Sequence, residues 1–329
     1  MIITGIGINA DAGNLDGDMA KLRRELEYCV ELGVSHVEIA PHGVGAVLNG
    51  RLNQDRTAEV QALLAEYPLK CTVHGPNPMN LMNLNEIITE RNLFQASISF
   101  ASQVGSEVLV YHAGRYLPEE QFLLRKPSAF TTRDRKVMWN MERMLLRQMG
   151  DEAGQRGITV VVENARPYLD ARDYCYGEQL EVLAVMVREV NHPQVGIALD
   201  IGHAHLSARF YDYDLLAGVG EISSMVRHIH LHDNFGKACA SYEKRQHELT
   251  ATGRGDLHLP VGWGSAPVKE ILNRLPGYSG VITLEMRPRY RAYYREALDN
   301  LRALLDVEPG INCRSAEKCG AGKAVEGLS

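Results

Sequence analysis

The stretch HIHLHDN, His228–Asn234, alternates polar and apolar side chains. Successive side chains of a β-strand point to opposite faces, so Ile229 and Leu231 would share one face, and His228 and His230 the other. The stretch therefore predicts a strand whose apolar face packs against helices and whose other face carries imidazoles.

Seven other short apolar or β-branched runs recur along the chain and alternate with segments of helical period, such as Lys21–Leu32 and Val137–Met149. This alternation is typical of βα units and a parallel sheet. Eight units predict an α/β fold, a single closed (β/α)₈ TIM barrel over residues 1–307. An open doubly wound sheet is the alternative, but no G-x-G-x-x-G follows the first run. The predicted strands are Ile2–Ile8, His36–Ala40, Lys70–His74, Glu107–His112, Ile158–Glu163, Val195–Asp200, Val226–Leu231 and Gly280–Glu285.

Two segments fall outside this repeat. Residues 236–255 form a long polar insertion after the seventh strand, and we expect it to lie over the active face as a functional or mobile loop. Residues 308–329 are rich in Gly, Ser and Ala and follow the last predicted helix, which predicts a flexible, disordered tail.

The composition restricts the class of protein. Of 329 residues, 45% are apolar and 23% charged, enough for a large core, and the net charge of −6 disfavours nucleic acid as a partner. The six cysteines form no CxxC pair, and the N-terminus lacks a signal sequence, which predicts a reduced, cytoplasmic location. No run approaches the roughly 20 apolar residues of a membrane span, so we expect no membrane partner. Oligomeric state is left open.

On six of the predicted strands, the last residue of the inward face can bind a metal, and it lies at or next to the end of the strand. The carboxyl ends of barrel strands meet at one face, where active sites of this architecture lie, so these six side chains should converge. Interleaved imidazoles and carboxylates are typical ligands of zinc, manganese and similar divalent ions. The six are His74, His112, Glu163, Asp200, His230 and Glu285.

Further candidates lie next to these strand ends. His203 follows Asp200 by three residues, and Asp256 and His258 stand two apart in an extended segment, so each is placed to join the same face. Of the remaining histidines in the opening stretch, His228 lies deeper and is expected to be a core residue or to support a ligand. His232 has left the strand and is expected to contact substrate.

These residues resemble those of the xylose-isomerase-like barrels, a group that includes endonuclease IV and the sugar isomerases and epimerases. The resemblance runs from Ile2 to about Asp306 and rests on the motifs VVVEN, LDIGH, HLHD and TLEM. For the isomerase branch it implies one divalent ion, with two glutamates moving protons beside it. That ion would be held by the matching residues Glu163, Asp200, His230 and Glu285.

The endonuclease IV branch adds five ligands, and all five have a match here: His74, His112, His203, Asp256 and His258. In that branch the resemblance implies three zinc ions, two of them bridged by the glutamate that matches Glu163. The insertion at 236–255 and the lack of recognisable DNA-intercalating loops set the chain apart from endonuclease IV. An AP endonuclease is therefore the least favoured alternative.

The full ligand set favours a divalent-metal-dependent hydrolase of a small molecule, acting on a phosphoester or related bond through a metal-activated water. Nucleotide-like and corrinoid substrates belong to this class. The expected cofactor is zinc, as one to three ions, with manganese as the alternative. The predicted catalytic residues are Glu163, Glu285 and His230, and the predicted substrate-binding residues are Arg115, Arg166, Arg287 and His232.

Two other functions stay open. The first is a sugar or sugar-phosphate isomerase or epimerase with one metal, in which Glu163 and Glu285 transfer the proton. The second is a barrel that binds a metal or ligand without catalysis.

Overall fold

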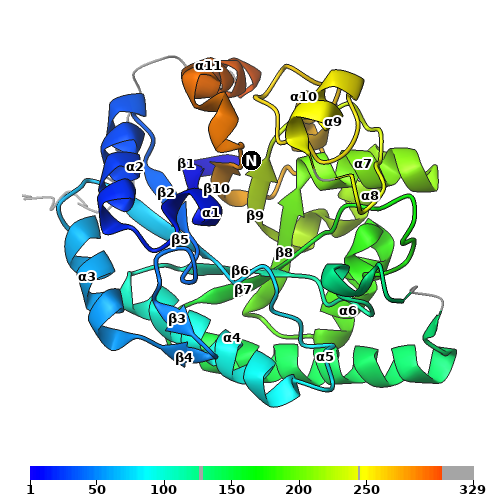
Figure 1. Ribbon diagram of the computed structural model, residues 1–329. Coiled ribbons are helices and arrows are strands. Elements are labelled where there is room, and N and C mark those ends of the chain that lie inside the picture. Colours follow the sequence, from blue (N-terminus) through cyan, green and yellow to red (C-terminus); the bar gives the residue numbers. More distant parts are fainter. Residues whose placement is uncertain (126–128, 244, 306–329) are drawn as a thin grey trace, which may run out of the picture.

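The computed structural model describes residues 1–125, 129–243 and 245–305 (Figure 1). The predicted tail, 308–329, lies outside the described residues. None of the described helices is both long enough and apolar enough to cross a membrane. Four cysteines are buried free thiols: Cys29, Cys71, Cys175 and Cys239.

Eight parallel strands close into a barrel in the order β1-β10-β9-β8-β7-β6-β5-β2, which confirms the TIM barrel and excludes the open sheet. All eight predicted strands form, with ends shifted by at most two residues. Glu285, predicted as the last residue of a strand, lies one residue beyond β10. The barrel strands are β1 (Ile2–Ala10), β2 (His36–Ile39), β5 (Lys70–His74), β6 (Val108–His112), β7 (Thr159–Glu163), β8 (Val195–Asp200), β9 (Val226–Leu231) and β10 (Ser279–Leu284). A separate hairpin pairs β3 (Val47–Leu48) with β4 (Arg51–Leu52).

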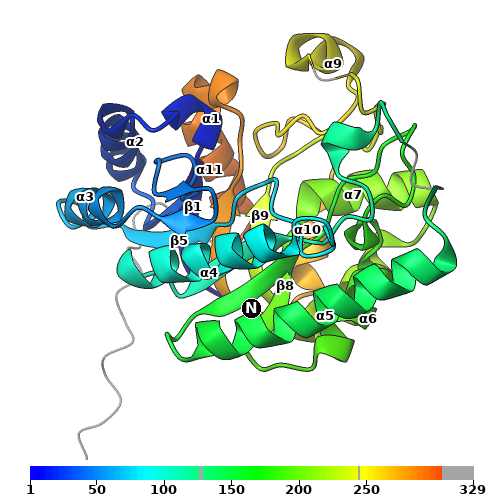
Figure 2. The same ribbon diagram turned by 60° about the horizontal axis from the view of Figure 1, so that its bottom comes forward.

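Helices surround the barrel, as Figures 1 and 2 show from two directions. The two predicted helices form and extend beyond the predicted ends, because Asp18 caps one and a Thr131–Asp134 capping box begins the other. The α-helices are α1 (Ala12–Leu15), α2 (Met19–Leu32), α3 (Gln54–Leu64), α4 (Ile87–Gln103), α5 (Thr132–Gly154), α6 (Leu180–Val190), α7 (Ile201–Tyr211), α8 (Leu215–Ile222), α9 (Gln246–Thr252), α10 (Val268–Asn273) and α11 (Tyr294–Leu304). Short 3₁₀ helices are η1 (Glu119–Gln121), η3 (Tyr176–Glu178), η4 (Ser223–Met225) and η5 (Pro288–Tyr293).

The main apolar core lies between the strands and the helices. Inside the barrel, Val110, Val161 and Ala198 form a small separate apolar cluster on β6, β7 and β8. The strand register pairs Ala198 with His228, and that histidine is buried together with Glu38. The interior is therefore apolar on one side and polar on the other.

The described residues of the 236–255 insertion include the helix α9. The backbone N–H and hydroxyl of Ser241 both donate to the carboxylate of Asp170, at 2.7 Å each. Asp170 belongs to the loop after β7, so the insertion lies at the carboxyl end of the barrel, as predicted. Its own ends are joined by a hydrogen bond of 2.7 Å from Gly255 N–H to the Lys237 carbonyl.

Candidate metal centre

The ends of the barrel strands bring the predicted ligands together around Glu163. This carboxylate is fully buried at the end of β7. Its Oε2 lies 3.3 Å from Nε2 of His74 and 3.1 Å from Nε2 of His112. Its Oε1 lies 2.9 Å from Nδ1 of His230. Side chains from four strands thus meet at one carboxylate, as expected at the carboxyl face of a parallel barrel.

A first donor group, cluster A, consists of Glu163, Asp200, His230 and Glu285, whose ligand atoms all lie within 4.8 Å of one another. Asp200 ends β8 and caps α7, and its Oδ1 accepts a hydrogen bond of 2.7 Å from the backbone N–H of His203. Its Oδ2 is buried and makes no hydrogen bond to any described residue. Cluster A therefore combines three carboxylates with one imidazole, and one buried carboxylate oxygen accepts no hydrogen bond from a described residue.

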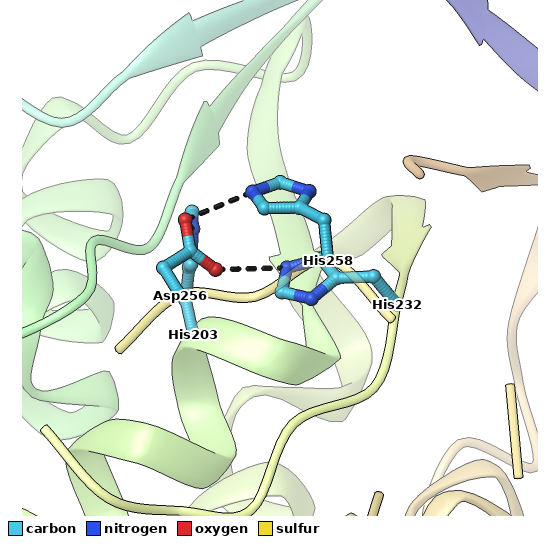
Figure 3. Close-up of side chains that lie close together, drawn as sticks. All are labelled: His203, His232, Asp256 and His258. Carbon is cyan, nitrogen blue, oxygen red and sulfur yellow. Dashed lines mark hydrogen bonds and ion pairs between the residues drawn. The ribbon is translucent and has the colours of Figure 1, made fainter. Parts of the chain in front are cut away.

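A second donor group, cluster B, consists of His203, His232, Asp256 and His258, with ligand atoms again within 4.8 Å of one another (Figure 3). Oδ2 of Asp256 lies 2.8 Å from Nε2 of His258 and 3.3 Å from Nε2 of His203. Nε2 of His232 lies 3.5 Å from Oδ1 of Asp256. All four residues are buried. The structure thus joins His232 to the three ligands predicted there.

Backbone carbonyls orient three of the imidazoles. Nδ1 of His203 donates to the Asn164 carbonyl at 3.0 Å. In the same way, Nδ1 of His258 donates to the Glu285 carbonyl and Nδ1 of His74 to the Gly75 carbonyl, at 2.7 Å each. In each ring the opposite nitrogen, Nε2, faces a carboxylate. Histidines that bind metals generally donate their other ring N–H in this way, which fixes the tautomer and the ring orientation. The three rings are therefore set to present an Nε2 lone pair.

The charges of the two clusters also fit divalent ions. Burial lowers the pKa of His203, but the carboxylates of Asp200 and Asp256 outweigh burial and raise it to about 10. Burial raises the pKa of Glu163, but the neighbouring His230 and other imidazoles hold it well below its usual value. Without a cation the buried carboxylates need protonated imidazoles as partners. A divalent ion would replace those protons, so the donor sets fit metal binding.

A cavity of about 400 Å³ adjoins both clusters. Its lining includes Glu285 of cluster A and His203 and His258 of cluster B. A smaller neighbouring hollow is lined by Glu163 and shares His203 with the cavity. A small molecule bound in the cavity would therefore contact residues of both clusters. No described residue of the 236–255 insertion lines the cavity.

Two of the three arginines predicted to bind substrate, Arg166 and Arg287, line this cavity. Nε of Arg287 is buried and makes no hydrogen bond to a described residue. The guanidinium of Arg115 donates to the backbone carbonyls of Asn77 and Met79, at 2.9 and 3.0 Å, and so holds the loop after β5. Arg115 lines the smaller hollow beside Glu163 and not the cavity, and its contact with substrate stays a prediction.

The sequence profile of the xylose isomerase-like TIM barrel family matches residues 26–304. The chain belongs to this family. It is 26% identical over 260 residues to an uncharacterized protein of Methanocaldococcus jannaschii, an alignment that covers 77% of this chain and 74% of that protein.

Solved structures of sugar epimerases have a similar fold. A D-tagatose 3-epimerase-like protein superposes with a TM-score of 0.66 at 21% identity and covers 92% of this chain and 99% of its own. An L-ribulose 3-epimerase gives 0.65 at 12% identity, covering 93% and 95%. A xylose isomerase-like TIM barrel protein from Mycobacterium smegmatis, solved in complex with magnesium, gives 0.64 at 17%, covering 92% and 97%. At these identities the likeness establishes the fold alone.

In this xylose isomerase-like barrel the two remaining histidines of the opening stretch differ in role. His228 is fully buried inside the barrel, with Nε2 3.0 Å from Oε2 of Glu38, which agrees with its expected position behind the ligands. His232 is also fully buried and does not line the cavity. Its predicted contact with substrate is therefore not supported, and its place is in cluster B.

Two residues that contact the candidate ligands were not predicted. Oε1 of Glu38, on β2, lies 2.9 Å from Nε2 of His230, the ring nitrogen on the far side from cluster A. Asn164 donates to the Asp200 carbonyl at 3.0 Å and accepts from its N–H at 2.8 Å. Alternation along β2 places Glu38 on the inner face, but Glu38 lies within the strand and the last residue of β2 is apolar, so the pattern of polar strand ends does not mark it.

Proposed function

We propose that this protein is a divalent-metal-dependent epimerase or isomerase of a keto sugar or keto-sugar phosphate. Cluster A carries the proposal, because its three carboxylates and one imidazole adjoin a cavity of about 400 Å³. Carboxylate-rich donor sets suit Mg²⁺ and Mn²⁺. A cavity of this size accommodates a monosaccharide or its phosphate.

When bound, a divalent ion would polarise adjacent oxygens of a keto sugar and so acidify the C–H bond beside them. Glu285 lines the cavity with a side chain that is 21% exposed, and it accepts the proton. Glu163 approaches from β7, the third strand from β10 around the barrel, and relays a proton from the neighbouring His74 imidazole to the substrate from another direction. Carboxylates on different strands can therefore act on different faces of one substrate carbon.

The side chains of the cavity also suggest the substrate's charge. Arg287 lies in the lining with a buried, unsatisfied Nε within the described part of the chain. Such a donor favours an anionic or strongly polar group, because an unpaired buried N–H costs roughly 1–3 kcal/mol. A phosphate or carboxylate at this end of the cavity would satisfy it.

The fold relatives support this class of reaction over hydrolysis. The D-tagatose 3-epimerase-like protein and the L-ribulose 3-epimerase share the barrel over more than nine-tenths of this chain. The names of these proteins describe epimerisation, and we extend that class to this chain as part of the proposal.

Hydrolysis is the second candidate, and cluster B favours it. The endonuclease IV-like ligands His203, Asp256 and His258 meet beside cluster A, so two or more ions could lie close together. Adjacent ions are typical of enzymes that activate water against phosphoesters.

One assay separates the candidates. The protein is loaded with Mn²⁺, Mg²⁺ or Zn²⁺ and incubated in D₂O with ketoses, ketose phosphates and a panel of phosphoesters, and products are followed by NMR. Epimerisation or isomerisation gives a new sugar in which solvent deuterium replaces one carbon-bound proton. Phosphoester cleavage without any sugar C–H exchange would overturn the proposal in favour of the hydrolase.

A matched pair of variants tests the residues. Glu285→Gln keeps the size of the side chain but removes the base, so exchange should fall by about 10²-fold or more. Glu248→Gln, at an exposed position on α9, should exchange as the wild type does. Equal rates for both variants would remove Glu285 from the mechanism.

A further inference from the structure

We infer that His232 is a fourth protein ligand of cluster B, which makes this cluster a closed, imidazole-rich site for a zinc-type ion beside cluster A. The inference goes beyond the proposed function, which needs only cluster A. It concerns a residue that the sequence pattern assigned to substrate.

The position of His232 supports ligation. Its side chain is fully buried, and neither ring nitrogen makes a hydrogen bond to a described residue. Nε2 lies 3.2 Å from Oδ1 of Asp200 and 3.5 Å from Oδ1 of Asp256, between one carboxylate of each cluster. The ring is thus within ion-pair distance of two carboxylates but in good hydrogen-bond geometry with neither, and a cation held between them would bind all three groups.

Two features of the chain hold the ring in this place. Asp233 and Leu259 form an isolated antiparallel bridge with two hydrogen bonds of 2.9 Å, which joins the residue after His232 to the residue after His258. The two imidazoles stack with their centroids 3.9 Å apart. The bridge therefore brings two ligands together from segments that are 26 positions apart in the sequence.

Gly202 provides the space for the ring. A Cβ at this position would overlap the imidazole of His232. Asn234 donates to the Gly202 carbonyl at 2.9 Å and so fixes the approach of α7 to the segment after β9. Because Gly202 directly precedes His203, the same turn of α7 leaves space for the ring of His232 and carries the ligand His203.

The donor set determines the kind of ion. Cluster B offers three imidazoles and one carboxylate, whereas cluster A offers one imidazole and three carboxylates. Imidazole suits zinc, and four protein donors complete the tetrahedron of a structural zinc site, while catalytic sites keep a position open. Cluster B therefore holds an ion without needing it for chemistry, and the presence of Asp256 and His258 does not require hydrolysis.

Metal binding without any substrate tests the inference, so its failure is distinct from failure of the proposed function. Zn²⁺ affinity and stoichiometry are measured for the wild type, for His232→Asn, and for the control His205→Asn, which removes a buried histidine outside both clusters. His232→Asn should weaken one zinc site by about 10²-fold and leave the other unchanged, because loss of a ligand costs at least as much as loss of a supporting residue. The control should bind zinc as the wild type does.

Gly202→Ala provides a second variant that leaves all four ligands in the chain. It displaces the ring of His232 and should weaken the same site. Unchanged zinc binding in both variants, or a wild type that binds only one ion at saturating Zn²⁺, would overturn the inference.

The wild type itself provides a readout that does not depend on how the variants fold. With Mn²⁺ in cluster A and one equivalent of Zn²⁺, X-ray absorption at the zinc edge reports on cluster B alone. Four-coordinate zinc with three imidazoles is expected. Zinc with two imidazoles, or with five or six ligands, would contradict the closed site.

Discussion

Clusters A and B adjoin the same cavity but are built in different ways. Cluster A takes its donors from the ends of β7, β8 and β9 and from the residue after β10, so the barrel itself holds them. Cluster B takes its donors from α7, from the segment after β9 and from the stretch containing Asp256 and His258. The barrel strands therefore position the donors of cluster A, whereas contacts between connecting segments position those of cluster B.

The chemistry follows the same division. The strand ends supply carboxylates beside a cavity, and such a set leaves room for substrate oxygens on the ion. The connecting segments supply the three imidazoles of cluster B, which are buried around Asp256.

The largest effect is expected from Glu163→Gln. This residue contacts His74, His112 and His230, so the change should abolish tight metal binding in cluster A and lower turnover by about 10³-fold or more. Elemental analysis and the deuterium-exchange assay measure both. The control is Glu142→Gln, because burial raises the pKa of Glu142 to about 7 and a neutral side chain should be tolerated there. Wild-type turnover in Glu163→Gln would contradict the role of cluster A as the catalytic site.

Asp256→Asn should affect cluster B alone. The side chain contacts His203 and His258, so zinc affinity of this cluster should fall by about 10- to 100-fold, while Mn²⁺ binding in cluster A persists. Under the proposed epimerase function, turnover should stay within about tenfold of the wild type. A large loss of turnover with Mn²⁺ still bound would instead favour the hydrolase. It would mean that both clusters take part in catalysis.

Glu38→Gln tests the support beneath cluster A. The carboxylate lies 2.9 Å from Nε2 of His230, so its loss should weaken Mn²⁺ binding by about 10- to 100-fold without changing zinc binding in cluster B. Thr72→Val removes another contact of Glu38, a hydrogen bond of 3.0 Å, and should have a smaller effect. Isothermal titration with each ion distinguishes these results. Equal losses at both clusters would mean that they are not independent.

The fourth prediction concerns pH and needs no change of residue. Neighbouring carboxylates outweigh the effect of burial and raise the pKa of His203 to about 10 and that of His74 to about 9. Both imidazoles are therefore positively charged at neutral pH in the metal-free protein. An ion entering cluster B must displace the proton of His203, and an ion held by the neighbouring group His74, Glu163 and His230 must displace that of His74. Apparent affinity should therefore rise about tenfold per pH unit for each proton released. Titrations at pH 6.5, 7.5 and 8.5 in buffers of different ionisation enthalpy measure the release. Affinity that is independent of pH would contradict these charges.

The sequence alone determined the barrel and the strand-end donors. Period-two alternation and apolar runs mark eight strands, and parallel strands in a closed barrel must bring their carboxyl ends to one face. His74, His112, Glu163, Asp200 and His230 therefore converge for reasons that a pattern of residues contains. Their roles as ligands stay predictions.

Only the tertiary structure decided how the residues outside those positions take part. Alternation stops where a strand ends, so it could not predict which way the side chain of His232 points. The position of that ring depends on the Asp233–Leu259 bridge and on the space at Gly202. The same holds for Arg115, which turns to backbone carbonyls of another loop, and for Glu38, which meets His230 across the barrel interior. These contacts join residues distant in the chain, and their geometry arises from closure of the barrel and packing of its loops, which no local period encodes.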